Sequence, residues 1–409
     1  MRFDSPRPSF QRKLESSLFF LCSSARAKKK SWIPAFAGMT RIWGAFLLLL
    51  SVQSFVWAED KSFTEIGTLP GAAYRIDIPA NWNHRVVVFF HGTTEKPVTF
   101  AQNEALPPAL SQLVQRKYAV IQSGYSAGGW ALEEAMADTE RLRQYFIGKH
   151  GKPTQFLVAG MSMGGTLTAM TIEQRPDIYA GALSLCGAIE PSDALFQRDF
   201  ALAAAFDFYF PGVLPPLVPV PASYVADEAM TKKIAVAFAS KPAAAQSLLR
   251  WYGAGDLASL PDVIADTLTD FRDLQHRTGG NPLGNADLIY TNTGDDTALN
   301  AGVRRYRADA KAAAWLARWY TPSGKLTRPM LALHDVGDPL VPAAGAFTYA
   351  MTAQRAGHGD RFVQQYVDRS GHCVFEPEEV ARAFDQLVDW VDTGTRPASG
   401  KLRGIVSKP

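Results

Sequence analysis

The stretch QFLVAGMSMGGT, residues 155–166, joins a short apolar run to the pattern Gly-x-Ser-x-Gly-Gly around Ser162. This pattern is typical of a tight strand-to-helix turn that lifts a serine hydroxyl above the end of a sheet, where flanking glycines prevent clashes. An earlier stretch, QSGYSAGGW at 122–130, repeats the pattern around Ser126 and also follows an apolar run. Both serines are therefore candidate nucleophiles, and the order of the strands must decide between them.

Short runs rich in Val, Ile, Phe and Leu alternate with longer amphipathic stretches from residue 63 onward. This alternation predicts a mostly parallel sheet with helices on both faces, and the nearly all-apolar central runs fit strands covered on both sides. We predict strands at 74–79, 86–92, 118–124, 155–160, 181–187, 329–335 and 362–368. Helices are predicted at 105–117, 133–151, 165–176, 343–357 and 377–394.

Residues 188–327 interrupt this alternation, because they contain no convincing strand, several Ala-rich helical stretches and the proline cluster FPGVLPPLVPVP at 210–221. Within this interval, one face of a helix predicted at 304–320 carries Tyr306, Ala310, Ala313, Leu316 and Tyr320. We therefore predict a helical insertion that packs over an edge of the sheet. Its aromatic side chains are individually typical of a core, and together they favour an apolar lining for a small-molecule site.

Four landmarks resemble the α/β-hydrolase superfamily over residues 63–395. They are a strand that ends in His-Gly at 91–92, a Gly-x-Ser-x-Gly turn, DPLVP at 338–342 after a later strand, and GHC at 371–373 after the last strand. The resemblance implies an α/β-hydrolase fold, with a mostly parallel central sheet flanked by helices and a helical cap inserted after the sixth strand. It assigns residues 59–187 and 328–409 to the hydrolase core and residues 188–327 to the cap.

Strand order then distinguishes the two serines. In this superfamily, one further strand and helix separate the His-Gly strand from the strand that precedes the nucleophile. Counting from the strand at 86–92, the next strand leads to Ser126 and the one after it, at 155–160, leads to Ser162. We therefore predict that Ser162 is the nucleophile, and that the glycines after Ser126 let its loop pass close to the active site.

A serine hydroxyl is a poor nucleophile near neutral pH, so the chemistry also needs a base and an orienting carboxylate. His372 is the predicted base because it follows the last predicted strand, whereas His358 precedes that strand and His91 belongs to the His-Gly turn. The superfamily pattern Asp-x-x-Val-Pro matches Asp338 and predicts it as the carboxylate. Asp335, directly at a strand end, is the alternative, and a turn-forming aspartate is the ordinary explanation for either residue.

The chain order Ser162, Asp338, His372 is that of the α/β-hydrolases and implies acyl transfer. His372 would take the Ser162 proton during attack on a carbonyl carbon and return it to the leaving group, while Asp338 orients the imidazole. Two backbone N–H groups are predicted to bind the oxyanion, that of Met163 after the nucleophile and that of Thr93 after the His-Gly turn.

Two cysteines, Cys186 and Cys373, remain once Cys22 is assigned to a leader. Cys186 ends the strand after the serine turn and Cys373 directly follows His372, so both are expected at the same edge of the sheet. A disulfide between them would anchor the histidine loop and, by closing a long loop, contribute roughly 4 to 5 kcal/mol. Two buried free thiols are the alternative.

The N-terminal region carries the pattern of an export signal. The apolar run IWGAFLLLLSV at 42–52 follows Arg41 and precedes a small-x-Ala ending at Ala58, and it is too short to span a bilayer comfortably. We predict a signal peptide at 39–58, a periplasmic or extracellular location and no stable membrane anchor. Residues 1–38 are predicted to be a non-native or disordered leader extension, because they resemble a translated bacterial intergenic repeat; an unusually long leader is the alternative.

Charge and motifs exclude several classes of function. Residues 1–58 hold nine of the 42 Lys and Arg residues and two of the 39 Asp and Glu residues, so the rest of the chain has a net charge of about −4. A basic nucleic-acid-binding surface is therefore not indicated. The chain also lacks His-Glu-x-x-His, paired Cys-x-x-Cys and Gly-x-x-x-x-Gly-Lys, so no metal site or cofactor is predicted.

The sequence thus predicts an exported serine hydrolase that cleaves carboxylic ester bonds in a small-molecule or polymeric substrate. A prolyl-peptidase or aminopeptidase is the first alternative, with Glu133, Glu134 and Glu190 as candidates to bind a substrate amine. A non-catalytic hydrolase-like binding protein is the second. The fold alone does not name the bond that is cleaved.

Overall fold

The computed structural model describes residues 62–253 and 255–403, within which nine strands form one sheet in the order β1-β2-β4-β3-β5-β6-β7-β8-β9. The strands are β1 (Phe63–Leu69), β2 (Ala72–Ile78), β3 (Arg85–Phe90), β4 (Ala119–Ser123), β5 (Gln155–Met161), β6 (Tyr179–Leu185), β7 (Met330–Gly337), β8 (Phe362–Ser370) and β9 (Gly400–Lys401). The predicted leader extension at 1–38 and signal peptide at 39–58 lie outside the described residues.

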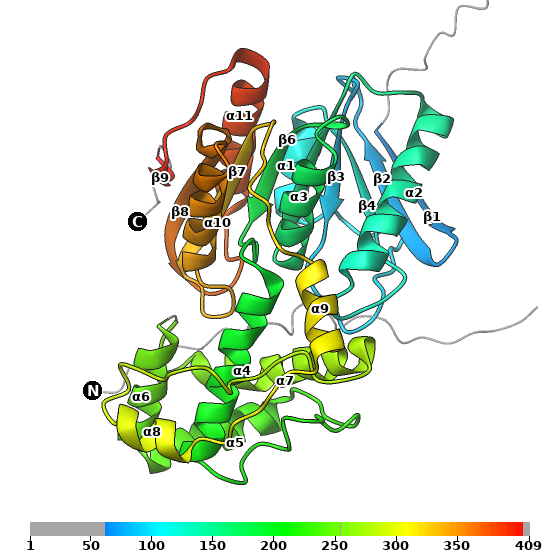
Figure 1. Ribbon diagram of the computed structural model, residues 1–409. Coiled ribbons are helices and arrows are strands. Elements are labelled where there is room, and N and C mark those ends of the chain that lie inside the picture. Colours follow the sequence, from blue (N-terminus) through cyan, green and yellow to red (C-terminus); the bar gives the residue numbers. More distant parts are fainter. Residues whose placement is uncertain (1–61, 254, 404–409) are drawn as a thin grey trace, which may run out of the picture. The chain divides into compact units, whose positions relative to one another are not determined.

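Helices connect most of the strands and flank the sheet (Figure 1). They are α1 (Pro108–Gln115), α2 (Leu132–His150), α3 (Met163–Gln174), α4 (Ser192–Tyr209), α5 (Glu228–Ser240), α6 (Pro242–Tyr252), α7 (Leu260–Thr278), α8 (Asp296–Gly302), α9 (Ala310–Arg318), α10 (Ala344–Arg355), the short 3-10 helix η1 (Gly359–Arg361) and α11 (Pro377–Thr393).

The sheet is parallel from β4 through β3 to β9, whereas β2 pairs antiparallel with both β1 and β4. The mostly parallel sheet predicted from the sequence is therefore confirmed. Strand β3 illustrates why the central strands of the sheet are apolar throughout. Val88 and Phe90 enter the core on one face, while Val87 and Phe89 enter the core on the other, as the alternation of side chains along a strand requires.

Each face of the sheet is covered by its own set of helices. Phe146 of α2, Leu167 of α3 and Tyr349 of α10 belong to one core, whereas Leu113 of α1 and Leu387 of α11 belong to the other. All five side chains are almost completely buried, and burial of such a side chain stabilises a fold by about 1.5 to 3 kcal/mol. The two cores therefore hold the sheet, and with it the strand ends, in place.

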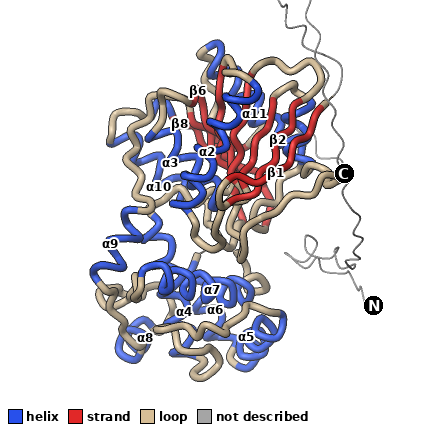
Figure 2. The backbone as a smooth tube through the Cα atoms, turned by 90° about the vertical axis from the view of Figure 1, so that its right-hand side faces the viewer, coloured by secondary structure: helices blue, strands red, loops and turns tan. Residues whose placement is uncertain are grey.

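Between β6 and β7 the described residues form six helices, α4 to α9, which we call the α4–α9 segment. Figure 2 shows α4, α5, α6, α7 and α8 gathered together at one end of the strands. Phe200, Phe206 and Phe271 are fully buried within this segment. The two ends of the segment are joined by hydrogen bonds between Ser192, the first residue of α4, and Tyr320, which follows α9. The Ser192 N–H donates to the Tyr320 carbonyl oxygen at 2.9 Å, and the Tyr320 N–H donates to Ser192 Oγ at 3.1 Å.

The helix predicted at 304–320 is shorter in the structure, because α9 begins only at Ala310. The residues before it make their backbone hydrogen bonds with a distant segment instead. Tyr306 donates its N–H to Asn285 Oδ1 at 2.8 Å, and Asp309 donates its N–H to the Asn281 carbonyl oxygen at 2.7 Å. These bonds replace the hydrogen bonds that a helix would have required.

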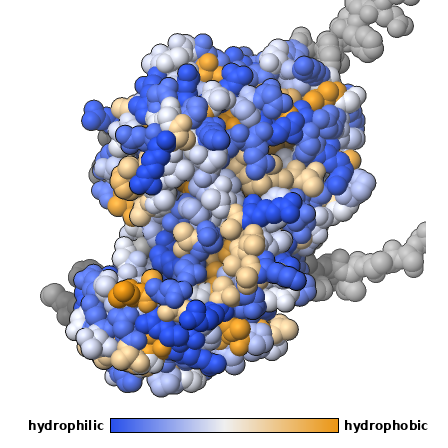
Figure 3. All heavy atoms as spheres, in the orientation of Figure 1, coloured by the Kyte–Doolittle hydropathy of each residue, from blue (hydrophilic) through white to orange (hydrophobic). Residues whose placement is uncertain are grey.

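The large apolar side chains exposed among the described residues are Phe63, Val225, Val236, Ile289, Val336 and Phe347. Figure 3 shows hydrophobic residues dispersed among hydrophilic ones on the face seen in Figure 1, so the apolar surface on that face is divided into small areas. In the part of the chain that the structure describes, no helix combines the length and apolarity needed to cross a bilayer.

Candidate active site

Ser162 occupies a sharp turn between the end of β5 and the first residue of α3, with φ 58° and ψ −125°. A non-glycine residue rarely adopts this conformation, and such strain is common at active sites. The turn packs tightly on β3, because a side chain at Gly164 would place its Cβ 2.0 Å from the Phe90 carbonyl oxygen. The Ser162 N–H also donates to the Leu185 carbonyl oxygen of β6 at 3.0 Å. The sheet thus holds the turn from two neighbouring strands.

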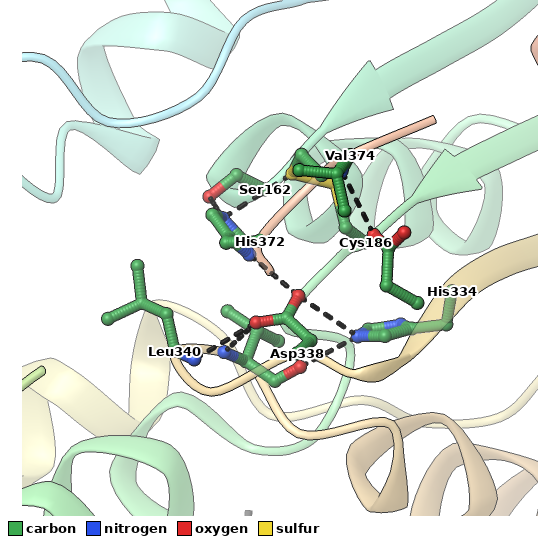
Figure 4. Close-up of a disulfide and its surroundings, with 10 residues drawn as sticks. Ser162, Cys186, His334, Asp338, Leu340, His372 and Val374 are labelled. Atoms are coloured by element: carbon green, nitrogen blue, oxygen red, sulfur yellow. Dashed lines mark hydrogen bonds and ion pairs between the residues drawn. A yellow bond between two sulfur atoms is a disulfide. The ribbon is translucent and has the colours of Figure 1, made fainter. Parts of the chain in front are cut away.

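His372 brings Ser162 and Asp338 into one hydrogen-bonded series (Figure 4). Its Nε2 lies 2.8 Å from Ser162 Oγ, and its Nδ1 lies 2.7 Å from Asp338 Oδ2. Ser162 follows β5, Asp338 follows β7 and His372 follows β8. These strands are parallel, so the three residues reach the same edge of the sheet. The structure therefore brings together the three side chains that the sequence predicted as nucleophile, base and carboxylate.

Asp338 is held by its own loop and by a second histidine. Its Oδ1 accepts the backbone N–H groups of Leu340 and Val341, both at 2.9 Å. His334 lies 3.6 Å from Asp338 Oδ2. Burial alone would raise the pKa of the Asp338 carboxyl, but its interactions with His334 and His372 outweigh burial and lower that pKa below its usual value. The carboxylate is consequently ionised and fixed in orientation.

His334 was not predicted as a partner of Asp338. Its imidazole is buried, and its Nε2 also lies 2.7 Å from the Val341 carbonyl oxygen. In the sequence, the one signal for this contact was that His334 and Asp338 are four residues apart in HDVGD. The same spacing is expected if His334 is an ordinary residue at the end of a strand. The contact depends on how the loop after β7 folds back, which this spacing does not determine.

Asp335, the alternative carboxylate, makes no hydrogen bond or ion pair with the His372 ring, which contacts Ser162 and Asp338. Its Oδ2 instead accepts the Val374 N–H at 3.2 Å, two residues beyond His372. Burial, together with the nearby charge of Asp338, raises the pKa of Asp335 to about 6. Asp338, directly after β7, contacts the imidazole, whereas Asp335, within the last residues of β7, supports the backbone of the histidine loop.

A disulfide joins Cys186, at the end of β6, to Cys373, with their Cα atoms 5.3 Å apart. It ties the histidine loop to the strand next to the serine turn (Figure 4). Among the described residues, Cys186, His372 and Cys373 are the one group of three close enough to share a metal ion. The thiolates that a metal would bind are, however, used in the S–S bond.

No protein-family model matches the chain, and no curated protein matches it. Among solved structures, it is similar to an acylaminoacyl peptidase in complex with Z-Gly-Gly-Phe-chloromethyl ketone (10% identity, TM-score 0.40, 85% of this chain and 43% of that chain). It is also similar to an esterase/lipase from an uncultured bacterium (13% identity, TM-score 0.42, 81% of this chain and 86% of that chain). A third similar structure is a puromycin hydrolase (16% identity, TM-score 0.43, 83% of this chain and 40% of that chain).

The chain thus spans less than half the length of the acylaminoacyl peptidase and of the puromycin hydrolase. At these identities and TM-scores the comparisons carry no inference about substrate or reaction. The fold is decided by the chain itself, through its strand order, its antiparallel β2 and the order in which Ser162, Asp338 and His372 follow β5, β7 and β8. This is the α/β-hydrolase fold.

Within the α/β-hydrolase fold, the second Gly-x-Ser-x-Gly-Gly motif lies in the loop after β4, as predicted. Ser126 is exposed, and its N–H donates to Asp138 Oδ2 at 2.7 Å. Among the described residues, no histidine hydrogen-bonds to Ser126. The neighbouring Tyr125 stacks on His91, with ring centroids 3.8 Å apart, and burial lowers the pKa of His91 to about 4. His91 is therefore neutral and packed as a structural residue.

Both backbone groups predicted to bind an oxyanion lie near Ser162. Met163 is the first residue of α3, and the first N–H groups of a helix have no intrahelical partner and carry a partial positive charge. Thr93 is exposed and follows Gly92, where a side chain would place its Cβ 3.0 Å from Ser162 Cβ. The loop after β3 therefore passes directly beside the serine, and the donor role of Thr93 stays a prediction.

Proposed function

We propose that this chain is a serine hydrolase that cleaves carboxylic ester bonds through an acyl-enzyme on Ser162. One observation supports the proposal most strongly: His372 lies within hydrogen-bond distance of both Ser162 Oγ, at 2.8 Å, and Asp338 Oδ2, at 2.7 Å. A neutral imidazole with its proton on Nδ1 donates to Asp338, and its Nε2 is then free to accept the serine proton.

In the acylation step, Ser162 Oγ bonds to the substrate carbonyl carbon while its proton moves to His372 Nε2. The carbonyl oxygen becomes an oxyanion, which the N–H groups of Met163 and Thr93 are proposed to bind; loss of one such donor typically lowers kcat by about 100- to 1000-fold. Breakage of the bond to the leaving alcohol then returns the proton from His372 to the alcohol oxygen. Asp338 stabilises the imidazolium between these two transfers.

Deacylation repeats the same proton transfers with water. His372 removes a proton from a water molecule as the water oxygen bonds to the acyl carbon, and the bond to Ser162 Oγ breaks as that oxygen regains a proton. The products are a carboxylic acid, an alcohol and the free enzyme. The buried, ionised Asp338 and the histidine loop hold the imidazole for both half-reactions.

Covalent labelling tests the nucleophile. We expect a fluorophosphonate probe to label the wild-type chain and Ser126→Ala, and not Ser162→Ala, with p-nitrophenyl acetate hydrolysis following the same pattern. Ser126→Ala is a matched control because Ser126 is an exposed serine in the same sequence motif. Label on Ser126 would contradict the assignment, and a wild-type chain that neither reacts with the probe nor hydrolyses the ester would favour the non-catalytic binding protein.

A serine peptidase is the second candidate, and two partly buried carboxyl groups on α7 are proposed as groups that could bind a substrate amine. Asp266 and Asp270 have no hydrogen bond or ion pair among the described residues. Burial, with the nearby charge of Asp262, raises the pKa of Asp266 to about 7, and burial raises the pKa of Asp270 well above its ordinary range. A substrate ammonium group would relieve this destabilisation of the ionised forms.

Two of the three glutamates predicted for that role, Glu134 and Glu190, already pair with arginines and are less suited to it. Glu134 pairs with Arg277 at 2.9 Å, and Glu190 lies 3.4 Å from Arg198. The two candidate activities are separated by comparing p-nitrophenyl acyl esters with aminoacyl and prolyl p-nitroanilides. We expect higher kcat/KM for the esters; higher kcat/KM for the anilides would support the peptidase.

We also propose that the protein is exported and reaches an oxidising compartment. The disulfide between Cys186 and Cys373 supports this, because such bonds persist in the periplasm and outside the cell. Fractionation of the native host, with N-terminal sequencing of the mature chain, provides the test. We expect a chain that begins after Ala58, whereas a full-length cytoplasmic chain with reduced cysteines would contradict export.

A further inference from the structure

The second Gly-x-Ser-x-Gly-Gly motif is not used by the proposed chemistry, yet its loop makes specific contacts on two sides. We call residues 124–130 the glycine loop. The Gly129 N–H donates to the carbonyl oxygen of Thr94, in the loop after β3, at 2.8 Å. On its other side, Gly129 faces α7, because a side chain there would place its Cβ 2.2 Å from the carboxyl group of Asp273. Gly129 also has a φ of +72°, which disfavours any other residue.

Helix α7 binds the glycine loop through Asp273 and Arg277. Asp273 Oδ2 accepts the backbone N–H of Trp130 at 2.7 Å and also lies 2.9 Å from Arg277 Nε. Arg277 donates to the carbonyl oxygen of Gly128 and pairs with Glu134 of α2 at 2.9 Å. The side chains of Asp273 and Arg277 are only 21% and 12% exposed, so these charge-assisted bonds are stronger than surface ion pairs.

The contacts form a series that leads from α7 to Ser162. Asp273 accepts the backbone N–H of Trp130, and the neighbouring Gly129 donates its N–H to the Thr94 carbonyl oxygen. Gly92, two residues before Thr94, packs against Ser162. The predicted oxyanion donor, Thr93, lies between Gly92 and Thr94 in the chain. A shift of the glycine loop would therefore move the backbone on which the oxyanion donor lies.

We propose that Asp273 is a positioning residue for the oxyanion-binding loop, acting from α7 through the glycine loop. The inference rests on the proposed serine hydrolase function and adds to it a role for the α4–α9 segment in aligning the catalytic backbone. Loss of the carboxyl group leaves the Trp130 N–H without its acceptor and frees the glycine loop. Because the oxyanion develops fully only in the transition state, misalignment lowers kcat and leaves KM nearly unchanged.

The test compares Asp273→Ala with Asp273→Asn, using p-nitrophenyl butyrate as the substrate. We expect Asp273→Ala to lower kcat by about 10- to 100-fold with KM within about twofold of wild type, since a misplacement of roughly 1 Å can cost about 100-fold. Asp273→Asn keeps an oxygen that can accept the Trp130 N–H, so kcat should stay within about threefold. Unchanged kcat in folded Asp273→Ala, or equal losses in the two variants, would overturn the inference.

Asp392→Ala is the matched control. Asp392 also pairs with an arginine, Arg85, at 2.7 Å, and its side chain is 32% exposed, but the pair lies at the start of β3, away from the serine turn. We expect its kcat to equal that of wild type. Should Asp273→Ala fail to fold, Arg277→Gln removes the support of Asp273 and should still lower kcat several-fold with KM unchanged; a wild-type kcat in this variant would overturn the inference.

The outcome is separable from that of the proposed function. A wild-type protein without esterase activity and without fluorophosphonate labelling would refute the hydrolase and this inference together. An active, labelled wild-type protein whose Asp273 variants retain full kcat would refute the positioning role of Asp273 alone.

Discussion

The Nδ1 atom of His372 and the Oδ2 atom of Asp338 are 2.7 Å apart, whereas Asp335, three residues before Asp338, contacts the backbone of the same loop. The fold thus gives the two carboxyl groups at the end of β7, Asp335 within the strand and Asp338 directly after it, different partners. Asp338 binds the side chain that would transfer the proton, whereas Asp335 binds the Val374 N–H. This difference yields predictions for each carboxyl group.

Asp338→Asn should lower kcat by about 10,000-fold, because the amide cannot hold the imidazole in the tautomer that accepts the serine proton. Steady-state hydrolysis of p-nitrophenyl acetate measures the effect. Asp335→Asn is the matched control, with kcat expected within about tenfold of wild type, since its amide oxygen can still accept the Val374 N–H. A larger loss in Asp335→Asn than in Asp338→Asn would mean that the two roles are exchanged.

Asp335 should also make stability depend on pH in an unusual direction. Burial raises its pKa in the folded state to about 6, above the ordinary value of 3.8, so the folded chain binds this proton more tightly than the unfolded chain. The stabilisation is complete below about pH 4 and is lost as the pH rises through about 6, a change of roughly 2 to 3 kcal/mol.

Urea unfolding of wild type and Asp335→Asn at several pH values isolates this contribution. We expect the stability of the variant relative to wild type to increase between about pH 4 and pH 7, because asparagine has no such proton to lose. A difference that does not change with pH over this range would show that Asp335 keeps an ordinary pKa.

The disulfide should stabilise the protein and hold the histidine loop. Its two cysteines are 187 residues apart, so on the chain-entropy estimate the bond contributes about 5 kcal/mol. The double variant Cys186→Ser, Cys373→Ser should therefore unfold at a lower temperature, and its kcat should fall because the loop carrying His372 has lost one of its anchors. Reductant should lower the Tm of wild type and leave that of the double variant unchanged.

Gly164→Ala tests the tight packing of the serine turn. The added methyl group would lie 2.0 Å from the Phe90 carbonyl oxygen, so the turn or β3 must move, at a cost of about 1 to 3 kcal/mol or more. Fluorophosphonate labelling of Ser162 should slow correspondingly. Gly148→Ala is the control, because Gly148 lies in α2 with no atom within 4 Å of the added Cβ, and alanine should stabilise that helix by about 0.5 to 1 kcal/mol.

Strand order, read through the resemblance to the α/β-hydrolase superfamily, made the fold and the position of Ser162 predictable from the sequence. The apolar runs identify the parallel strands, and parallel strands deliver their following residues to one edge, so the approach of Ser162, Asp338 and His372 could be expected. The sequence did not determine which side-chain atoms would meet at that edge. The contact of Asp335 with Val374 depends on the course of two loops, and no residue pattern encodes that course.

Contacts between distant segments limited the remaining predictions. The helix predicted at 304–320 has the right periodicity, but the hydrogen bonds of Tyr306 and Asp309 go to Asn285 and Asn281. Likewise, Asp273 and Trp130 are separated by 143 residues, and nothing in either local sequence indicates that they meet. Such pairings arise from tertiary packing, which overrides the preference of a short segment for helix.

The hydrogen bonds between Ser192 and Tyr320 bring together the two points at which the chain leaves and re-enters the sheet region. Because the ends of the α4–α9 segment meet in this way, the whole segment can be replaced by another of similar end-to-end distance without separating β6 from β7. Chimeric proteins that keep the sheet and receive the corresponding segment of another protein with the α/β-hydrolase fold would therefore test whether this segment sets substrate preference, provided that the graft retains an acceptor for the backbone N–H of Trp130.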